Sequence, residues 1–197
     1  MLIDEFLPVY TFVERHATDV CAPPEVVYRA IRSADLARAL PVRLLLALRA
    51  LPAALWSGRA GIGMLAARSR AAITLHDFQG HGFVVLAENP PNEIVIGLVG
   101  AFWTPRGGIR ETDALQFCGP QASGTARAAW NFALEANGPG RTQLTTETRI
   151  QPADPGSAKR LRAYWFFVRP WSGLTRRYML HAIREEAERR PHAGRRT

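Results

Sequence analysis

The histidines are the side chains of this sequence best suited to bind a metal ion or to transfer a proton near neutral pH. Their spacing does not favour a metal site, because no two of them stand four residues apart and neither cysteine belongs to a Cys-x-x-Cys pair. The sequence also lacks a nucleophile elbow, a phosphate-binding loop and a paired-carboxylate motif. We therefore predict no metal ion, no cofactor and no identifiable catalytic residue. The histidines are His16, His76, His81, His181 and His192.

Among these, His76 falls in a predicted strand, on the same side as Thr74 and Phe78. It would either line a cavity or belong to the polar face of the sheet, and both interpretations stay open.

Glu147 and Arg149 form a second group able to do chemistry, because they stand two apart on one predicted strand and so share a face. An acid and a base placed in this way can bind the polar head group of a ligand. They more often form a ladder of charges across neighbouring strands on the outer face of a sheet, and we favour that interpretation.

The third group combines aromatic side chains with hydroxyls. Trp130 and Phe132 share one side of a predicted strand, and Thr146 and Thr148 share one side of its hairpin partner. Apolar walls with a few placed hydroxyls suit an amphipathic ligand, although aromatic residues in such places are first of all core. The predicted ligand-binding residues are Trp130, Phe132, Thr146, Thr148, Tyr164, Trp165 and Val168.

A long C-terminal helix must position the last three of these residues. Asp154 is a suitable N-cap, Pro155 suits the first helical position, and apolar residues recur after it at helical spacing. Pro170 lacks a backbone N–H, so we predict that it kinks or breaks this helix into two segments, with Ser172 and Gly173 absorbing the bend.

Alternating apolar and polar residues predict an antiparallel sheet that the long helix covers. A Leu-, Ala- and Arg-rich segment at residues 36–70 interrupts the strands and predicts further helix. Residues 93–103 are apolar on both faces, so we expect residues 36–70 to cover the second face. The predicted strands are residues 10–20, 72–78, 82–88, 93–103, 109–118, 123–137 and 141–151, with a short helix at 25–32.

Two short motifs carry a resemblance to a known family. Residues 22–28, Ala-Pro-Pro-Glu-Val-Val-Tyr, lead from the first strand into the first helix, and residues 145–149, Thr-Thr-Glu-Thr-Arg, form the strand that leads into the long helix. The sequence resembles the START-like helix-grip superfamily, also called SRPBCC, which includes polyketide cyclase/dehydrase and lipid-transport proteins. The resemblance implies an α+β fold in which a curved antiparallel sheet of about seven strands wraps a long C-terminal helix around a cavity for an apolar ligand. The longer helical insertion after the first strand and Pro170 depart from the simplest members.

Length and composition bound the organisation of the chain. With 197 residues and 47% hydrophobic residues, we predict a single domain over residues 1–190, with residues 36–70 as an insertion or lid and residues 191–197 as a disordered basic tail. No apolar run approaches the roughly 20 residues of a membrane span, and the N-terminal residues do not read as a signal peptide. We expect a cytoplasmic protein. Cys21 and Cys118 are expected to be small buried residues in a reducing compartment.

The net charge of +8 comes almost entirely from arginine. Clustered cations favour nucleic acid, but here the charges are scattered, so we predict a solvated basic surface and no nucleic-acid site. Residues 42–51 could form a membrane-surface helix, and we favour a buried helix instead because their cations do not gather on one face.

From these patterns we expect the protein to bind, carry or sense a small hydrophobic or amphipathic molecule in a cavity between the sheet and the C-terminal helix. One alternative is a cyclase- or hydrolase-type enzyme acting in the same cavity. A second is an interaction protein with a filled core. Convergent titratable groups in the cavity would favour the enzyme, hydroxyls among apolar walls would favour carriage, and the oligomeric state is left open.

Overall fold

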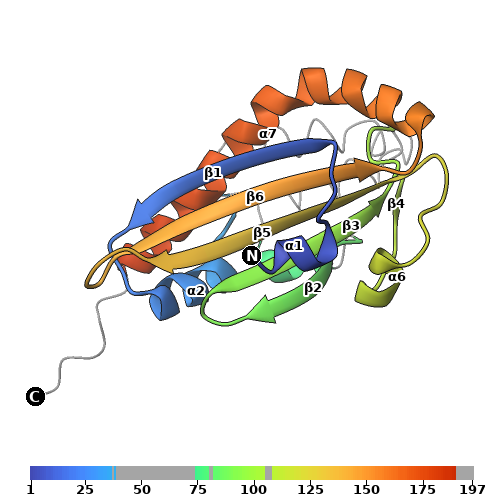
Figure 1. Cartoon of the computed structure of the whole chain (residues 1–197). Coiled ribbons are helices and arrows are strands. Elements are labelled where there is room, and N and C mark those ends of the chain that lie inside the picture. Colours follow the sequence, from blue (N-terminus) through green and yellow to red (C-terminus); the bar gives the residue numbers. More distant parts are fainter. Residues whose placement is uncertain (37, 39–73, 80–81, 105–107, 190–197) are drawn as a thin grey trace, which may run out of the picture.

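The computed structural model describes residues 1–36, 38, 74–79, 82–104 and 108–189, which form an α+β fold. These residues build an open antiparallel sheet in the order β1-β6-β5-β3-β2, with β4 paired to β3, and a long helix α7 at the C-terminal end (Figure 1). The strands are β1 (Phe12–Val20), β2 (Val84–Asn89), β3 (Glu93–Gly100), β4 (Ile109–Arg110), β5 (Ala126–Ala136) and β6 (Thr142–Pro152). The helices are α1 (Ile3–Phe6), α2 (Pro24–Ser33), α5 (Leu75–Gln79), α6 (Ala114–Cys118) and α7 (Pro155–Arg189). The arrangement is compatible with a helix-grip fold.

The N-terminus of α7 confirms the predicted cap. The backbone N–H of Ser157 donates to Asp154 Oδ1 at 2.8 Å, and the N–H of Gly124 donates to Asp154 Oδ2 at 2.7 Å. These bonds to Gly124 and Ser157 lower the pKa of Asp154 below its usual range. One carboxylate therefore caps the helix and fastens it to the loop before β5.

The predicted division of this helix at Pro170 is wrong. α7 continues through Pro170, and Figure 1 shows one helix that changes direction along its length. Pro170 cannot bond the carbonyl of Phe166, one turn earlier, and both residues are exposed. A helix can continue through a proline at such an exposed position, because water is able to solvate the freed carbonyl.

Two of the predicted strands are wrong as well, because each contains a helix start. The first of these is residues 72–78, of which 72 and 73 lie outside the described residues. Here the backbone N–H and the hydroxyl of Thr74 both donate to Asp77 Oδ2, and helix α5 begins at the next residue. In residues 109–118, only β4 is strand, and a reciprocal capping box between Asp113 and Gln116 begins α6. The described residues thus give six strands, against the predicted seven.

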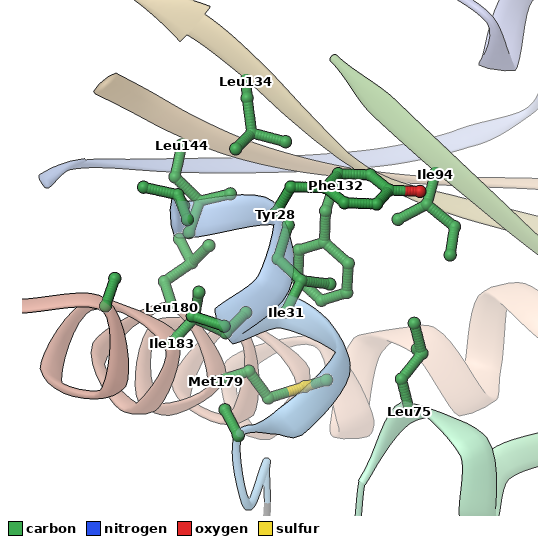
Figure 2. Packing of buried hydrophobic residues seen from close by; sticks show 14 of the residues in the cluster. Tyr28, Ile31, Leu75, Ile94, Phe132, Leu134, Leu144, Met179, Leu180 and Ile183 are labelled. Atoms are coloured by element: carbon green, nitrogen blue, oxygen red, sulfur yellow. The ribbon is translucent and has the colours of Figure 1, made fainter. Parts of the chain in front are cut away.

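The main core fills the space between one face of the sheet, α2 and α7. Figure 2 shows Phe132, Leu134 and Ile94 of the sheet pointing toward Ile31 of α2 and Met179 of α7. Burial of such large apolar side chains is the principal source of stability. Nearer the N-terminus of α7, a second cluster forms around Leu161 on the same face.

The opposite face of the sheet is covered by α1 and α6. Ile3 and Leu7 from the N-terminal segment and Phe117 of α6 pack against Val95 and Ala129. Among the described residues, this cover comes from the N-terminal segment and α6. The segment that we predicted to provide it, residues 36–70, lies outside the described residues apart from 36 and 38, so that prediction stays untested. The predicted tail at 191–197 lies outside them as well.

Cys21 and Cys118 are free and exposed, so the prediction that both are buried is wrong. Within the described ranges, no helix has the length and apolar character needed to cross a membrane.

Candidate functional site

Four of the predicted ligand-binding residues lie together on the face of the sheet that packs against α7. Trp130 of β5 is opposite Thr148 of β6, and Phe132 is opposite Thr146. All four side chains are buried. Thr146 is already satisfied, because its hydroxyl donates to the carbonyl of Asn131 at 2.7 Å.

The three residues predicted on α7 lie farther along the sheet. Tyr164 and Trp165 are half-buried against the cluster around Leu161, whereas Phe132 belongs to the cluster with Met179 and Ile183. Trp165 packs near Phe12, with ring centroids 6.0 Å apart, and Val168 is half-buried. The seven residues therefore divide between two packing clusters, and a single chamber lined by all of them stays a prediction.

Polar residues that the sequence analysis did not select lie between these clusters. Glu14 and His16 of β1 point toward α7, and His16 Nε2 lies 3.0 Å from Glu14 Oε1. The side chain of Glu14 is 10% exposed and that of His16 is 16% exposed. Because an ionised carboxylate only accepts hydrogen bonds, the tautomer of a neutral imidazole that fits this contact has its hydrogen on Nε2 and its lone pair on Nδ1. The pair is thus an imidazole oriented by a carboxylate.

Gly173 allows α7 to approach this pair. A Cβ atom at this position would lie 2.6 Å from Glu14 Oε1 and 3.4 Å from the ring of His16. The absence of a side chain at Gly173 therefore lets the helix backbone pass over the two polar groups.

Two buried oxygens in this region lack a hydrogen-bond partner among the described residues. They are Oε2 of Glu14 and Oγ1 of Thr148, and the two residues are directly opposite in the β1–β6 pairing. Opposite residues on one face of an antiparallel pair have Cβ atoms only about 5 Å apart. Because buried polar atoms are normally hydrogen-bonded, this pair of oxygens requires an explanation.

Arg176 of α7 adds a positive charge to the same region. Its guanidinium carbon lies 4.5 Å from the ring centroid of Trp130, which also contacts Phe83 edge-on at 5.2 Å. Burial lowers the pKa of Arg176 to about 10, while the charge of Glu14 acts in the opposite direction. The guanidinium is therefore held over an aromatic face where little water screens its charge.

A hollow of about 530 Å³ lies between β1 and α7 and reaches His16. Its volume falls within the range of small-molecule sites, and its walls carry both basic and apolar groups. His16, on the wall of this hollow, also contacts Glu14, which carries one of the two buried oxygens. The lining residues are Arg15, His16, Ala17, Thr18, Arg177, Leu180 and His181.

A second hollow, of about 50 Å³, has room for little more than ordered water. Glu88 on its wall accepts hydrogen bonds from the hydroxyl of Tyr28 at 2.8 Å and from Arg32 at 2.6 Å. Burial, and then Glu88, raise the pKa of Tyr28 to about 12. His76 lines this hollow from α5, so its predicted place in a strand, on the polar face of the sheet, is wrong.

Glu147 and Arg149 lie on the outer face of the sheet, as the favoured interpretation predicted. Glu147 accepts from Arg149 Nε at 2.6 Å and from Arg15 on the neighbouring strand, and Arg149 also reaches Asp4 at 2.7 Å. Burial raises the pKa of Glu147, but the bonds from Arg149 and Arg15 outweigh burial and lower it. With Arg149 donating to the carbonyl of Leu7, the network fastens the N-terminal segment to the sheet.

The alternation of residues along β1 was the sequence signal that could have identified Glu14 and His16 as helix-facing residues. Phe12, Glu14, His16 and Thr18 alternate with more exposed neighbours and end at the buried Val20, so they share one face. Neither side of this strand is purely apolar, and the mixture obscured the buried face.

No protein-family model matches the chain, and no curated protein matches it. A solved structure, that of TTHA0849 from Thermus thermophilus, is similar at 13% sequence identity and a TM-score of 0.35, covering 90% of this chain and 97% of the other. A likeness of this degree supports no conclusion about function.

Proposed function

We propose that the protein binds a small amphipathic molecule between β1 and α7, with carriage or sensing of that molecule as its role. The START-like helix-grip resemblance is part of the same proposal, supported by the order of a first strand, a Pro-Pro helix start, antiparallel strands and a long C-terminal helix.

The observation that carries the proposal is the pair of buried oxygens on Glu14 and Thr148. Removing such groups from water without a partner costs about 1–3 kcal/mol each. A ligand hydroxyl satisfies both, since it donates to the carboxylate and accepts from the threonine. Next to these oxygens, Trp130 and Phe83 supply apolar surface for the remainder of the molecule.

We propose that the ligand reaches these groups through the hollow between β1 and α7. His16 lines it and contacts Glu14, while Arg177 and Arg15 make its walls basic. An amphipathic molecule with a polar or anionic end gains from this charge, and its apolar part gains about 25 cal/mol for each Å² buried.

A fluorescence titration tests the proposal. Anilinonaphthalene sulfonate, an amphipathic probe, is titrated into the wild type, into Thr18→Trp, which adds bulk on the helix-facing side of β1 where Thr18 lines the hollow, and into Ala136→Trp, which adds the same bulk at the exposed end of β5. We expect saturable binding to the wild type and the control and at least a tenfold loss in Thr18→Trp. Absence of wild-type binding, or equal binding by both variants, would contradict the proposal.

The pairing of His16 with Glu14 favours a second candidate, an enzyme of the hydrolase or cyclase kind. An imidazole oriented by a carboxylate is a suitable general base. Hydrolysis of a chromogenic aryl ester would then be lost in His16→Asn and kept in His181→Asn, whose histidine is 64% exposed on the same hollow. Equal rates in the two variants would exclude this candidate.

A further inference from the structure

The exposed side of α7 near Pro170 carries an aromatic patch that the site between β1 and α7 does not use. Phe166, Phe167 and Trp171 are 78%, 71% and 53% exposed, and the two phenylalanine rings meet edge to face with centroids 5.4 Å apart. Soluble proteins seldom expose three large aromatic side chains together without a partner. We call Phe166, Phe167 and Trp171 the aromatic patch.

Cations surround the aromatic patch on the same helix. Arg162 stands four residues before Phe166, Arg169 stands three after it, and both are exposed. Lys159 and Arg160 extend the exposed surface toward the start of α7. Residues 155–175 contain four lysine and arginine residues and no aspartate or glutamate.

We propose that this side of α7 docks on the surface of an anionic lipid bilayer. Phenylalanine and tryptophan enter the boundary between head groups and acyl chains, and flanking arginines contact lipid phosphates and anionic head groups. The exposed charges of Lys159, Arg160, Arg162 and Arg169 are complementary to such a surface. Single-stranded nucleic acid fits less well, because the aromatic side chains project from a helix rather than line a basic groove.

Pro170 belongs to the same exposed surface. It stands between Phe167 and Trp171 in the sequence, it is exposed, and α7 continues through it. This proposal stands independently of ligand binding between β1 and α7, because none of its residues lines that hollow.

Co-sedimentation with vesicles tests the proposal. The full chain is mixed with vesicles of phosphatidylcholine alone or of phosphatidylcholine with phosphatidylglycerol. We expect binding to the anionic vesicles, weak binding to the neutral ones, and a marked loss as salt screens the charges. The Phe166→Ser/Phe167→Ser/Trp171→Ser variant should lose at least tenfold in affinity, and Arg169→Gln should lose about fivefold.

Two matched variants control for general effects of the substitutions. Leu115→Ser removes an 87% exposed side chain from α6, and Arg141→Gln removes an exposed cation from the β5–β6 turn. Both should bind like the wild type. The proposal is overturned if the wild type ignores anionic vesicles, or if the triple variant binds as well as Leu115→Ser. It is also overturned if the patch substitutions instead abolish binding to a single-stranded oligonucleotide or dissociate a dimer in analytical ultracentrifugation.

Discussion

Trp130 is the single residue that best separates a packed core from a ligand wall. It is 5% exposed, touches Phe83 and lies under Arg176. We expect Trp130→Ala to cost about 3–5 kcal/mol in the free energy of unfolding, measured by urea denaturation. The control, Leu115→Ala, removes an exposed side chain and should change it by less than about 0.5 kcal/mol. Lost stability with unchanged binding of the amphipathic probe would assign Trp130 to the core alone.

Glu147 forms the buried centre of the charge network on the outer face. Its side chain is 2% exposed and that of Arg149 is 6% exposed, so Glu147→Gln leaves a buried cation without its nearest anion. We expect a loss of about 3–5 kcal/mol in the free energy of unfolding.

The control for this prediction is Arg184→Gln, which breaks the exposed pair between Arg184 and Glu188 on α7. Pairs of this kind contribute less than about 1 kcal/mol. If urea denaturation gave the two variants equal losses, the network on the outer face would not stabilise the fold as described.

At the scale of elements, the cap of α7 predicts a dependence of stability on pH. Hydrogen bonds lower the pKa of Asp154 in the folded state, so its carboxylate stabilises the fold above the unfolded pKa of about 4. This contribution is lost as the pH falls through the folded pKa. We expect Asp154→Asn to unfold at lower urea than the wild type at pH 7 and the difference to shrink in acid. A difference that stayed constant with pH would contradict this account of the cap.

The crossing of α7 over β1 depends on Gly173. Leucine has the higher helix propensity, but its Cβ would meet Glu14 Oε1 at 2.6 Å and its remaining atoms would displace the helix. We expect Gly173→Leu to cost about 1–3 kcal/mol in thermal or urea unfolding. Ala163→Leu, at an exposed position of the same helix, should be nearly neutral.

Elements with strong local signals could be predicted from the sequence. Asp154 and Pro155 marked the start of α7, the two prolines at 23 and 24 marked α2, and alternation marked the β5–β6 hairpin. α5 and α6 were missed because their apolar residues also suit short strands. Their capping residues, Thr74 with Asp77 and Asp113 with Gln116, carried the correct signal.

The candidate site was less predictable, because its residues meet only through tertiary packing. Aromatic and threonine parity in the hairpin correctly placed Trp130 and Thr148 on the helix-facing side. Nothing local in the sequence places Arg176 over Trp130 or Gly173 beside Glu14, since these contacts join residues far apart in the chain. The alternation of residues therefore predicted the aromatic and hydroxyl side chains of the candidate site but not its charged groups.

At the scale of the whole molecule, the two faces of the sheet differ in how their charges are satisfied. On the outer face, Glu93, Asn131, Glu147 and Arg149 form a closed hydrogen-bonded network beneath the N-terminal segment. On the helix-facing side, oxygens of Glu14 and Thr148 lack partners among the described residues. This asymmetry supports the proposal that the ligand binds on the helix-facing side, with the outer face as scaffold.

The most direct test of this claim is a two-dimensional amide NMR titration of the full chain with the amphipathic probe anilinonaphthalene sulfonate. Binding between β1 and α7 should produce its largest shifts at residues 14–18 and 173–181 and leave α6 and β2 nearly unchanged. Saturation of those shifts at one equivalent is the predicted result. Absence of shifts, or largest shifts around Tyr28 and Glu88 instead, would contradict the account.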